Sequence, residues 1–356
     1  MKTNNLLLHS DNLVALQYLL DSGFKGQIDL VYIDPPFATG GNFTITNGRA
    51  TTISNSRNGH IAYSDTLKGG DFIEFLRERL LLIRELMSEQ GSIYLHIDYK
   101  IGHYVKVMMD EVFGIENFRN DITRVKCNPK NFDRVGYGNI KDMILFYSKS
   151  ANPIWNEPRE KYSERDLEKL FPKKDAKGRR YTTVPIHAPG ETENGKSNQP
   201  FKGMLPPAGR HWRTDVATLE QWDAAGLIEW SANGNPRKII YADEREGKRV
   251  QDIWEFKDPQ YPDYPTEKNA DLLDLIVKTS SNAGSIVMDC FCGSGTTLKA
   301  AQQQNRQWIG IDQSDLAIQA TCRKLDAIQC NLFVRKDEYD FINLDIDLPI
   351  ILETVS

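Results

Sequence analysis

The residues best suited to do chemistry in this 356-residue chain are the four of Asp34-Pro35-Pro36-Phe37. They follow the mostly apolar run 28–33, which is typical of a strand buried on both faces of a parallel sheet. The motif is therefore expected at that strand's carboxyl end, the edge where open α/β sheets bind ligands. Two successive prolines form a rigid turn beside one carboxylate and one aromatic face, which suits a planar ligand with an amino group. An ordinary strand-to-loop turn would contain the same residue types.

A second candidate site lies near the other end of the chain. Residues 285–290 form another buried-strand pattern, followed by Phe291-Cys292-Gly293-Ser294-Gly295-Thr296-Thr297 and a helix expected from Leu298. Glycines at a strand-to-helix turn allow a ligand to approach the backbone closely. A dinucleotide-binding fingerprint would carry a third Gly or Ala at position 298, so Leu298 weakens an NAD interpretation.

Together these motifs resemble those of the S-adenosylmethionine-dependent DNA amino-methyltransferases. Asp34-Pro35-Pro36-Phe37 resembles their catalytic motif, and Phe291-Cys292-Gly293-Ser294-Gly295 resembles their cofactor loop. The order, catalytic motif first, is that of the beta group, which includes modification subunits of type III restriction systems and many solitary adenine methyltransferases. The chain departs from the commonest pattern at Phe37, where Tyr is more frequent, and at Cys290, where Pro is usual.

The resemblance implies an α/β fold: a Rossmann-like methyltransferase with a mostly parallel sheet and helices on both faces, plus an inserted α+β target-recognition region. Strand and helix patterns do alternate up to about residue 150. One expected helix spans 71–89 and is stopped by Gly91, before a strand over 92–98. We expect a catalytic half over 1–150, the target-recognition insertion over 151–261, and a cofactor-binding half with a C-terminal tail over 262–356.

The cofactor that the resemblance implies is S-adenosyl-L-methionine. Asp312 ends a further expected strand, and a carboxylate there suits the two hydroxyls of a ribose. Three of the candidates have a plainer alternative: Asp11 as a helix N-cap, Lys268 as a solvated helix cap and Asp312 as a loop residue. The full set of cofactor-binding residues implied is Asp11, Asn12, Asp34, Lys268, Asp289, Phe291, Gly293, Gly295, Thr297 and Asp312.

The catalytic motif predicts methylation of the exocyclic N6 of adenine. The Asp34 carboxylate and the Pro35 carbonyl would each accept a hydrogen bond from one N–H of the amine, and the rigid Pro35-Pro36 turn would hold these two acceptors in place. Phe37 would stack on the flipped-out base. N4-cytosine enzymes more often carry Ser before Pro-Pro, so Asp34 favours adenine. Methylation of cytosine N4, an RNA or protein amino-methyltransferase, and an inactive DNA-binding homologue remain the alternatives.

Double-stranded DNA is the expected partner, and the net charge of −5 requires a local basic surface. Such a surface is predicted within 119–141 and, in the insertion, at a basic and aromatic cluster; solvated charges and core tryptophans are the alternatives. The Gly-, Asn- and Thr-rich stretch 38–64 is predicted to be a mobile flap over DNA. The residues predicted to contact DNA are Arg124, Lys126, Lys130, Arg134, Arg210, His211, Trp212 and Arg213.

Composition sets the remaining expectations. The chain has no apolar run near 18 residues and no signal-peptide pattern, so we expect a cytoplasmic, nucleoid-associated protein without a membrane partner. Its five cysteines include no C-x-x-C pair, which indicates no metal site. The strand residue His96 is expected to be packed rather than catalytic. Relatives in the beta group lead us to expect a homodimer and a cognate restriction endonuclease.

Overall fold

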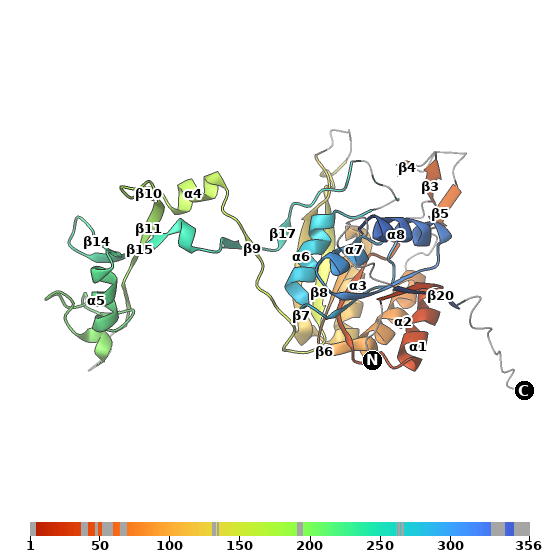
Figure 1. The fold of residues 1–356 in the computed structure, drawn as a ribbon, viewed down its shortest axis with the longest axis horizontal. Coiled ribbons are helices and arrows are strands. Elements are labelled where there is room, and N and C mark those ends of the chain that lie inside the picture. The colour runs from red at the N-terminus through yellow and green to blue at the C-terminus, as the bar shows by residue number, and fades with distance from the viewer. Residues whose placement is uncertain are drawn as a thin grey trace, which may run out of the picture. The chain divides into compact units, whose positions relative to one another are not determined.

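The chain folds into two compact units, Met1–Pro158 together with Gln251–Ser356 (unit 1) and Arg159–Val250 (unit 2). Unit 2 lies inside the predicted insertion 151–261. For residues 42–46, 49–51 and 60–64 only the backbone is described. The structure, a computed structural model (Figure 1), describes residues 5–36, 42–46, 49–51, 60–64, 70–129, 133, 135–190, 195–260, 262, 264, 267–328 and 339–344.

Unit 1 is built on a nine-stranded sheet. Within the described residues every pairing between neighbouring strands is parallel except the two that β8 makes. The mostly parallel sheet expected from the sequence is therefore confirmed. In spatial order its strands are β17 (Ile253–Trp254), β7 (Phe118–Val125), β8 (Lys141–Ser148), β6 (Met87–Ile97), β2 (Ile28–Ile33), β18 (Ile286–Asp289), β19 (Gln307–Asp312), β1 (Asn5–His9) and β20 (Tyr339–Asn343).

Helices cover both faces of this sheet, as the sequence predicts. Side chains alternate along a strand, so Leu6 and Leu8 of β1 point to one face and Leu7 to the other. Leu6 and Leu8 share a core with α1 (Asn12–Asp21), α2 (Gly70–Leu86) and α3 (Tyr99–Phe113). Leu7 instead lies near Leu298, beside Gly310. The helices of that second face are α6 (Ala270–Ser280), α7 (Thr296–Gln303) and α8 (Asp315–Ile328), and a short 3-10 helix, η1 (Ile115–Asn117), follows α3.

The junction of α2 and β6 differs from its prediction. The helix ends at Leu86 and the strand begins at Met87, so Gly91 lies inside the strand rather than ending the helix. Ile28 pairs with Met87 but Leu30 pairs with Ser92, so the register shifts between them. A Cβ on Gly91 would lie 2.9 Å from the carbonyl oxygen of Ile28, which explains why glycine occupies this irregular stretch.

The predicted flap contains strands. A small antiparallel sheet in the order β4-β3-β5 forms within the stretch that the sequence pattern leaves as loop. Its strands are β3 (Asn42–Thr46), β4 (Arg49–Thr51) and β5 (His60–Ser64). The sequence pattern gave no sign of these strands, and motion of the flap over DNA stays a prediction. The rest of 38–64 lies outside the described residues.

Unit 2 is an α+β unit with its own core of Ile186, Phe201, Trp212 and Leu219. A four-stranded sheet, β10-β11-β15-β14, is accompanied by the pairs β12-β13 and β16-β9. Its helices are α4 (Glu164–Leu170) and α5 (Val216–Ala224), with 3-10 helices η2 (Lys196–Asn198) and η3 (Ala242–Glu244). Its strands are β9 (Arg159–Glu160), β10 (Lys173–Lys174), β11 (Arg180–Pro185), β12 (His187–Pro189), β13 (Arg210–Trp212), β14 (Ile228–Trp230), β15 (Pro236–Tyr241) and β16 (Lys248–Arg249).

Candidate active site

Most of the residues predicted to act on cofactor or substrate meet in one cavity of about 420 Å³ in unit 1. It opens at the carboxyl ends of β2, β18 and β19, where parallel strands share an edge. Of the remaining predicted residues, Pro35 is buried beside it and Gly295 forms the N-cap of α7, while Phe37 lies outside the described residues. The predicted residues that line the cavity are Asp11, Asn12, Asp34, Pro36, Lys268, Asp289, Phe291, Gly293, Thr297 and Asp312.

Asp34 has two oxygens in different situations. Its Oδ2 lies 2.6 Å from the ammonium of Lys268, and the two side chains are only 15% and 11% exposed. Its Oδ1 is buried, and among the described residues no group hydrogen-bonds to it. A buried acceptor without a donor costs free energy, so this atom fits a ligand that brings an N–H or O–H.

The glycine loop after β18 adopts a conformation that other residues rarely reach. Gly293 and Gly295 have φ angles of 52° and 73°, in the left-handed region. A Cβ on Gly295 would lie 2.8 Å from Oγ1 of Thr321, which donates to the Gly293 carbonyl at 2.9 Å. The loop is therefore held tightly against α8, with its backbone facing the cavity.

The carboxylates of Asp289 and Asp312 hold this loop by hydrogen bonds. Asp289 accepts hydrogen bonds from the Phe291 N–H at 3.1 Å and the Thr297 hydroxyl at 2.6 Å. Burial raises the pKa of Asp289 to about 7, against the effect of these bonds. Asp312 accepts from the backbone N–H groups of Gly293 and Ser314, both at 2.9 Å, and burial raises its pKa as well. A carboxylate has about four acceptor positions, so Asp312 keeps capacity for a ligand hydroxyl.

Arg79 of α2 is a site residue that sequence reasoning missed. Its buried guanidinium stacks 3.5 Å from the Phe75 ring centre, donates to Oδ1 of Asn12 and lies 3.2 Å from Oδ2 of Asp11. Asp11 also accepts from the Leu13 N–H at 2.8 Å, so it caps α1 as well as lining the cavity. Arg79 thus ties together the wall formed by α1 and α2.

Lys324 of α8 ties together three other segments that line the cavity. Its ammonium donates to the hydroxyls of Ser294 and Thr296, both at 2.9 Å, and pairs with the carboxylate of Glu267. These partners belong to the glycine loop, to the start of α7 and to the residue before Lys268. No local sequence pattern marks Lys324, because its partners are distant in the chain.

His96 is packed, as the sequence predicts. It is fully buried in β6, with Nδ1 2.9 Å from the Tyr32 hydroxyl and Nε2 3.2 Å from Oδ2 of Asp142. Burial lowers the pKa of His96, and the positive charge of Lys268 lowers it further, against the hydrogen bond to Asp142. The histidine therefore braces β2 two residues before Asp34.

A family model for DNA methylases matches residues 28–322. The chain belongs to the DNA methylase family. It is 42% identical over 326 residues to the type II methyltransferase M.EcaI of Enterobacter cloacae, covering 90% of this chain and 69% of that one. It is 24% identical over 342 residues to the StyLTI Mod subunit of Salmonella typhimurium, a type III restriction-modification enzyme, covering 86% of this chain. The methylase spans about half the length of that subunit, 51%.

Solved structures of low sequence identity also match the methylase. The crystal structure of an M1.HpyAVI-SAM complex aligns with a TM-score of 0.48 at 16% identity, covering 90% of this chain and 98% of that one. The cytosine-N4-specific PvuII DNA methyltransferase aligns with a TM-score of 0.48 at 14% identity, covering 94% of this chain and 90% of that one.

Two of the predicted DNA contacts of the methylase were wrong. Arg124 is fully buried among carboxylates in unit 1, so it cannot reach DNA phosphates. Trp212 is 1% exposed, packs on Phe201 and donates its indole N–H to the Gln199 carbonyl at 2.9 Å, so it is a core residue of unit 2. In both cases a pattern of basic and aromatic residues concealed a side chain that points inward.

The other predicted DNA contacts of the methylase stay predictions. Lys126 is paired with Asp142 at 2.5 Å, and Lys130 and Arg134 lie outside the described residues. Arg210 and Arg213 are exposed in unit 2, and His211, between them, is half-buried.

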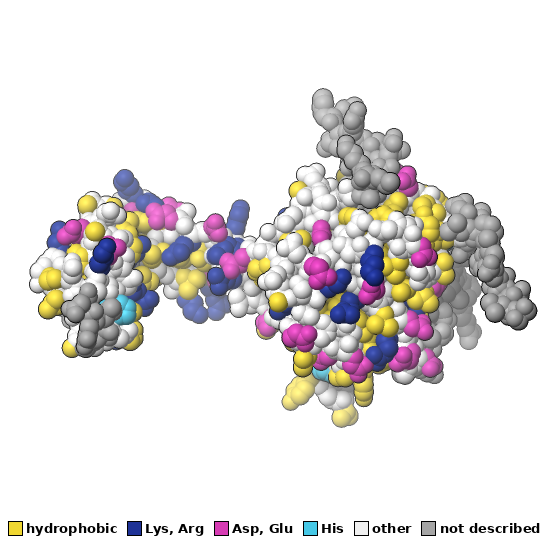
Figure 2. Space-filling view, turned by 90° about the horizontal axis from the view of Figure 1, so that it is seen from below, with side chains coloured by type: hydrophobic (Ala, Val, Ile, Leu, Met, Phe, Trp, Pro, Cys, Tyr) yellow, Lys and Arg dark blue, Asp and Glu magenta, His cyan; other side chains and the backbone are white. Residues whose placement is uncertain are grey.

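Unit 2 carries a positive net charge in an acidic chain. Residues 159–250 hold 18 Lys and Arg against 14 Asp and Glu, a formal charge of +4 where the whole chain has −5. Figure 2 shows Lys and Arg side chains gathered on the viewed face of this unit.

Among the described residues, no cluster of three or more His, Cys, Asp or Glu could hold a metal ion, and no helix has the length and apolarity needed to span a membrane.

Proposed function

We propose that this chain transfers a methyl group from S-adenosyl-L-methionine to the exocyclic N6 of adenine in double-stranded DNA. The observation that carries the proposal is Oδ1 of Asp34, a buried acceptor without a donor among the described residues, in the same cavity as the glycine loop. Membership of the DNA methylase family, over residues 28–322, supports the reaction class.

The cavity fits the proposed cofactor. Its volume of about 420 Å³ is in the range of small-molecule sites. The backbone of the glycine loop, without a Cβ at Gly293, leaves room for close approach, and Asp312 offers a carboxylate to a ribose. Phe75 and Phe291 supply apolar surface, with ring centres 6.3 Å apart. When bound, S-adenosylmethionine supplies an electrophilic methyl group.

Residues of the catalytic motif are proposed to make the exocyclic amine of adenine more nucleophilic. The lone pair of adenine N6 is delocalised into the ring, which makes the nitrogen a poor nucleophile. In our proposal Oδ1 of Asp34 accepts a hydrogen bond from one N–H of the adenine amine, and the Pro35 carbonyl accepts one from the other. The lone pair of N6 is thereby exposed. Lys268 holds Oδ2 and thereby orients Oδ1. Acceptors that are already in place where charge develops lower the barrier without reorganisation.

The target adenine is flipped out of the duplex, because a paired base cannot reach a cavity of this kind. Unstacking costs a few kcal/mol, and stacking on Phe37 would offset about 1–3 kcal/mol of it. Unit 2, with its positive charge, is proposed to recognise the DNA target. The names of the matched relatives support work in a restriction-modification system. A cognate endonuclease, a homodimer and action in the cytoplasm complete the proposal.

The test is expression in a host that lacks DNA methylation of its own, followed by mass spectrometry of nucleosides from the host DNA. N6-methyladenine is expected with the chain as it stands and is expected to be absent with Asp34→Ala, which removes the acceptor oxygens of the side chain. N4-methylcytosine would keep the reaction class and overturn the choice of adenine. Neither base, from a protein shown to be folded and to bind S-adenosylmethionine, would overturn the proposed function.

A further inference from the structure

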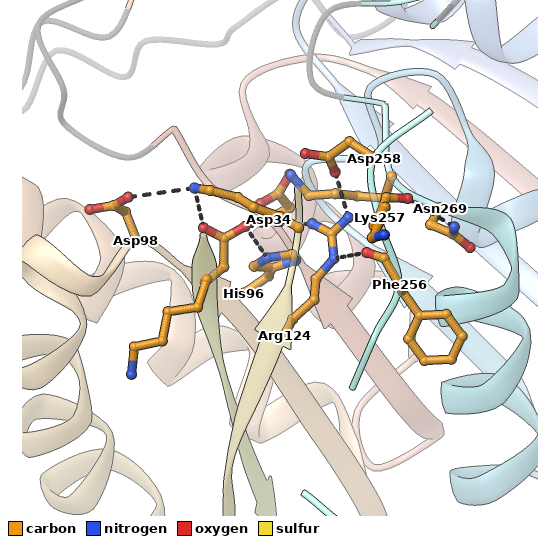
Figure 3. A network of polar contacts seen from close by, with 12 residues as sticks. Asp34, His96, Asp98, Arg124, Phe256, Lys257, Asp258 and Asn269 are labelled. Carbon is orange, nitrogen blue, oxygen red and sulfur yellow. Dashed lines mark hydrogen bonds and ion pairs between the residues drawn. The ribbon is translucent and has the colours of Figure 1, made fainter. Parts of the chain in front are cut away.

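Arg124 of β7 is a fully buried guanidinium that is not among the described residues lining the cavity. Its Nε donates to the Phe256 carbonyl at 2.7 Å, and its other nitrogens contact the carboxylates of Asp258 and, at 3.5 Å, Asp142. Figure 3 shows this guanidinium between the strands and segment 256–258. Segment 256–258 belongs to the stretch through which the chain returns from unit 2 to unit 1.

Segment 256–258 is tied in turn to the start of α6. Asn269 donates its side-chain N–H to the Lys257 carbonyl at 2.9 Å, as Figure 3 also shows. Its Oδ1 accepts from the Asp271 N–H at 2.9 Å, which makes Asn269 the N-cap of α6. The residue before this cap is Lys268, whose ammonium holds Asp34. A continuous series of contacts therefore runs from Arg124 to the predicted catalytic carboxylate.

A second series reaches the same carboxylate from the other side. Asp142, which contacts Arg124, accepts from His96, and His96 contacts the hydroxyl of Tyr32 in β2. Tyr32 lies two residues before Asp34 on that strand. The ion pairs of Arg124 and Asp142 thus link both supports of Asp34.

Stability alone does not explain a guanidinium in this place. Apolar residues of similar volume often replace a buried ion pair without loss of stability, because both charges must give up their hydration. An arginine can, however, bond a carbonyl and two carboxylates at fixed angles at the same time, which a lysine cannot do. That geometry is useful where one segment must be held in register against another.

We propose that Arg124 is a positioning residue: it fixes segment 256–258 and, through Asn269, the place of Lys268 beside Asp34. The inference rests on the proposed function of Asp34 and adds to it a requirement for a residue that touches neither cofactor nor DNA. It acts on the rate of transfer rather than on the binding of either ligand.

The test compares Arg124→Lys with Arg119→Lys in the full chain. Arg119 is a matched control, because it lies on the same strand and donates to the Ser148 hydroxyl and the Ser150 carbonyl, both at 2.8 Å. We expect Arg124→Lys to lower kcat about tenfold to a hundredfold with little change in KM for DNA, since small misplacement of reacting groups has effects of that size. Arg119→Lys should leave kcat unchanged. Equal effects of the two variants on kcat would overturn the positioning role.

A variant at the half-buried Asn269 covers the case in which Arg124→Lys does not fold. Asn269→Ser keeps an oxygen to cap α6 but loses the N–H that donates to the Lys257 carbonyl. It should lower kcat in the same direction as Arg124→Lys, and the two losses together should be smaller than the product of the separate losses, because both act through Lys268. An unchanged kcat in Asn269→Ser would overturn the route through Asn269, whether or not Arg124→Lys folds. Where both variants fold, losses that multiply would overturn the common route as well.

Hydrogen exchange of the ligand-free protein separates this inference from the proposed function. The backbone amides of residues 256–258 and 267–270 should exchange faster in Arg124→Lys than in the wild type. Their exchange rates should be unchanged in Arg119→Lys. If exchange changes in this way but the wild type modifies no DNA, the proposed function fails and the structural link stands. If the wild type methylates DNA and Arg124→Lys changes neither exchange nor kcat, the positioning role is wrong.

Discussion

Lys268 Nζ lies 2.6 Å from Oδ2 of Asp34, although the two residues come from opposite halves of the chain. The ion pair leaves Oδ1 as the oxygen without a donor among the described residues. One carboxylate thus carries a structural contact on one oxygen and an open acceptor on the other. The cavity beside Asp34 exists in this form only when both halves of unit 1 are folded together.

The ion pair between Lys268 and Asp34 predicts how the free energy of unfolding responds to removal of either charge. Lys268→Met should lower the free energy of unfolding by about 3 kcal/mol, because it leaves a mostly buried carboxylate without its cation. The double variant Lys268→Met with Asp34→Asn removes that charge and should recover part of the loss. Urea unfolding at constant pH measures all three proteins. A double variant less stable than Lys268→Met would contradict this account.

Asp289 predicts a pH dependence of stability. Burial raises its folded-state pKa to about 7, above the value near 4 of an unfolded chain. The folded protein therefore binds this proton more tightly, so the Asp289 contribution favours folding below pH 4 and is lost as the pH rises to about 7. Asp289→Asn removes the titration, and its stability relative to wild type should rise by up to about 4 kcal/mol between pH 4 and pH 8. A difference independent of pH, measured by denaturant unfolding, would count against the raised pKa.

Gly295 predicts a cost beyond backbone strain. Gly295→Ala must adopt a φ near 73° and also place a Cβ 2.8 Å from Thr321 Oγ1. Gly284→Ala is the control, since its φ is 85° but nothing lies within 4 Å of its Cβ. Both variants pay about 1–2 kcal/mol for the left-handed conformation, and only Gly295→Ala should also weaken binding of S-adenosylmethionine in calorimetry. Equal cofactor affinity in the two variants would show that the loop is not part of the cofactor site.

Arg210 and Arg213 predict the salt dependence of DNA binding. If each contacts a phosphate, Arg210→Gln and Arg213→Gln should each reduce the slope of log affinity against log salt by about 1. Lys173→Gln is the control, because Lys173 is paired with Glu229 in the same unit. Fluorescence anisotropy with duplex DNA over a range of salt concentrations gives the slopes. Slopes equal to the wild type for both Arg variants would place the DNA surface elsewhere.

The sequence predicted the parts of the fold that depend on local pattern. The continuous apolar runs of β2, β18 and β19 arise because these strands are buried on both faces, and such runs are visible in any window of the chain. Their polar ends meet in one cavity because parallel strands share an edge. Asp11 was likewise recognisable as a helix N-cap, since its donor is only two residues away.

The same local view failed for side chains whose partners are distant. Arg124 lies in a basic run that resembles a solvated surface, but its carboxylate partner Asp258 is more than a hundred residues away and draws it into the interior. Trp212 stands between basic residues, yet it fills the core of unit 2. Composition counts charges and rings but does not show which way they point.

The chain by itself therefore determined the strands β2, β18 and β19, the two motifs and the edge at which they meet, because hydrophobic periodicity and turn chemistry act over a few residues. Only the tertiary structure decided which polar groups are buried and with what they pair. Arg79 and Lys324 hold the two walls of the cavity, and neither belongs to a recognisable motif. Their roles follow from burial of their charged groups in the folded chain. Because an unpaired buried charge is costly, each of them pairs with groups that are close in the fold but distant in the sequence.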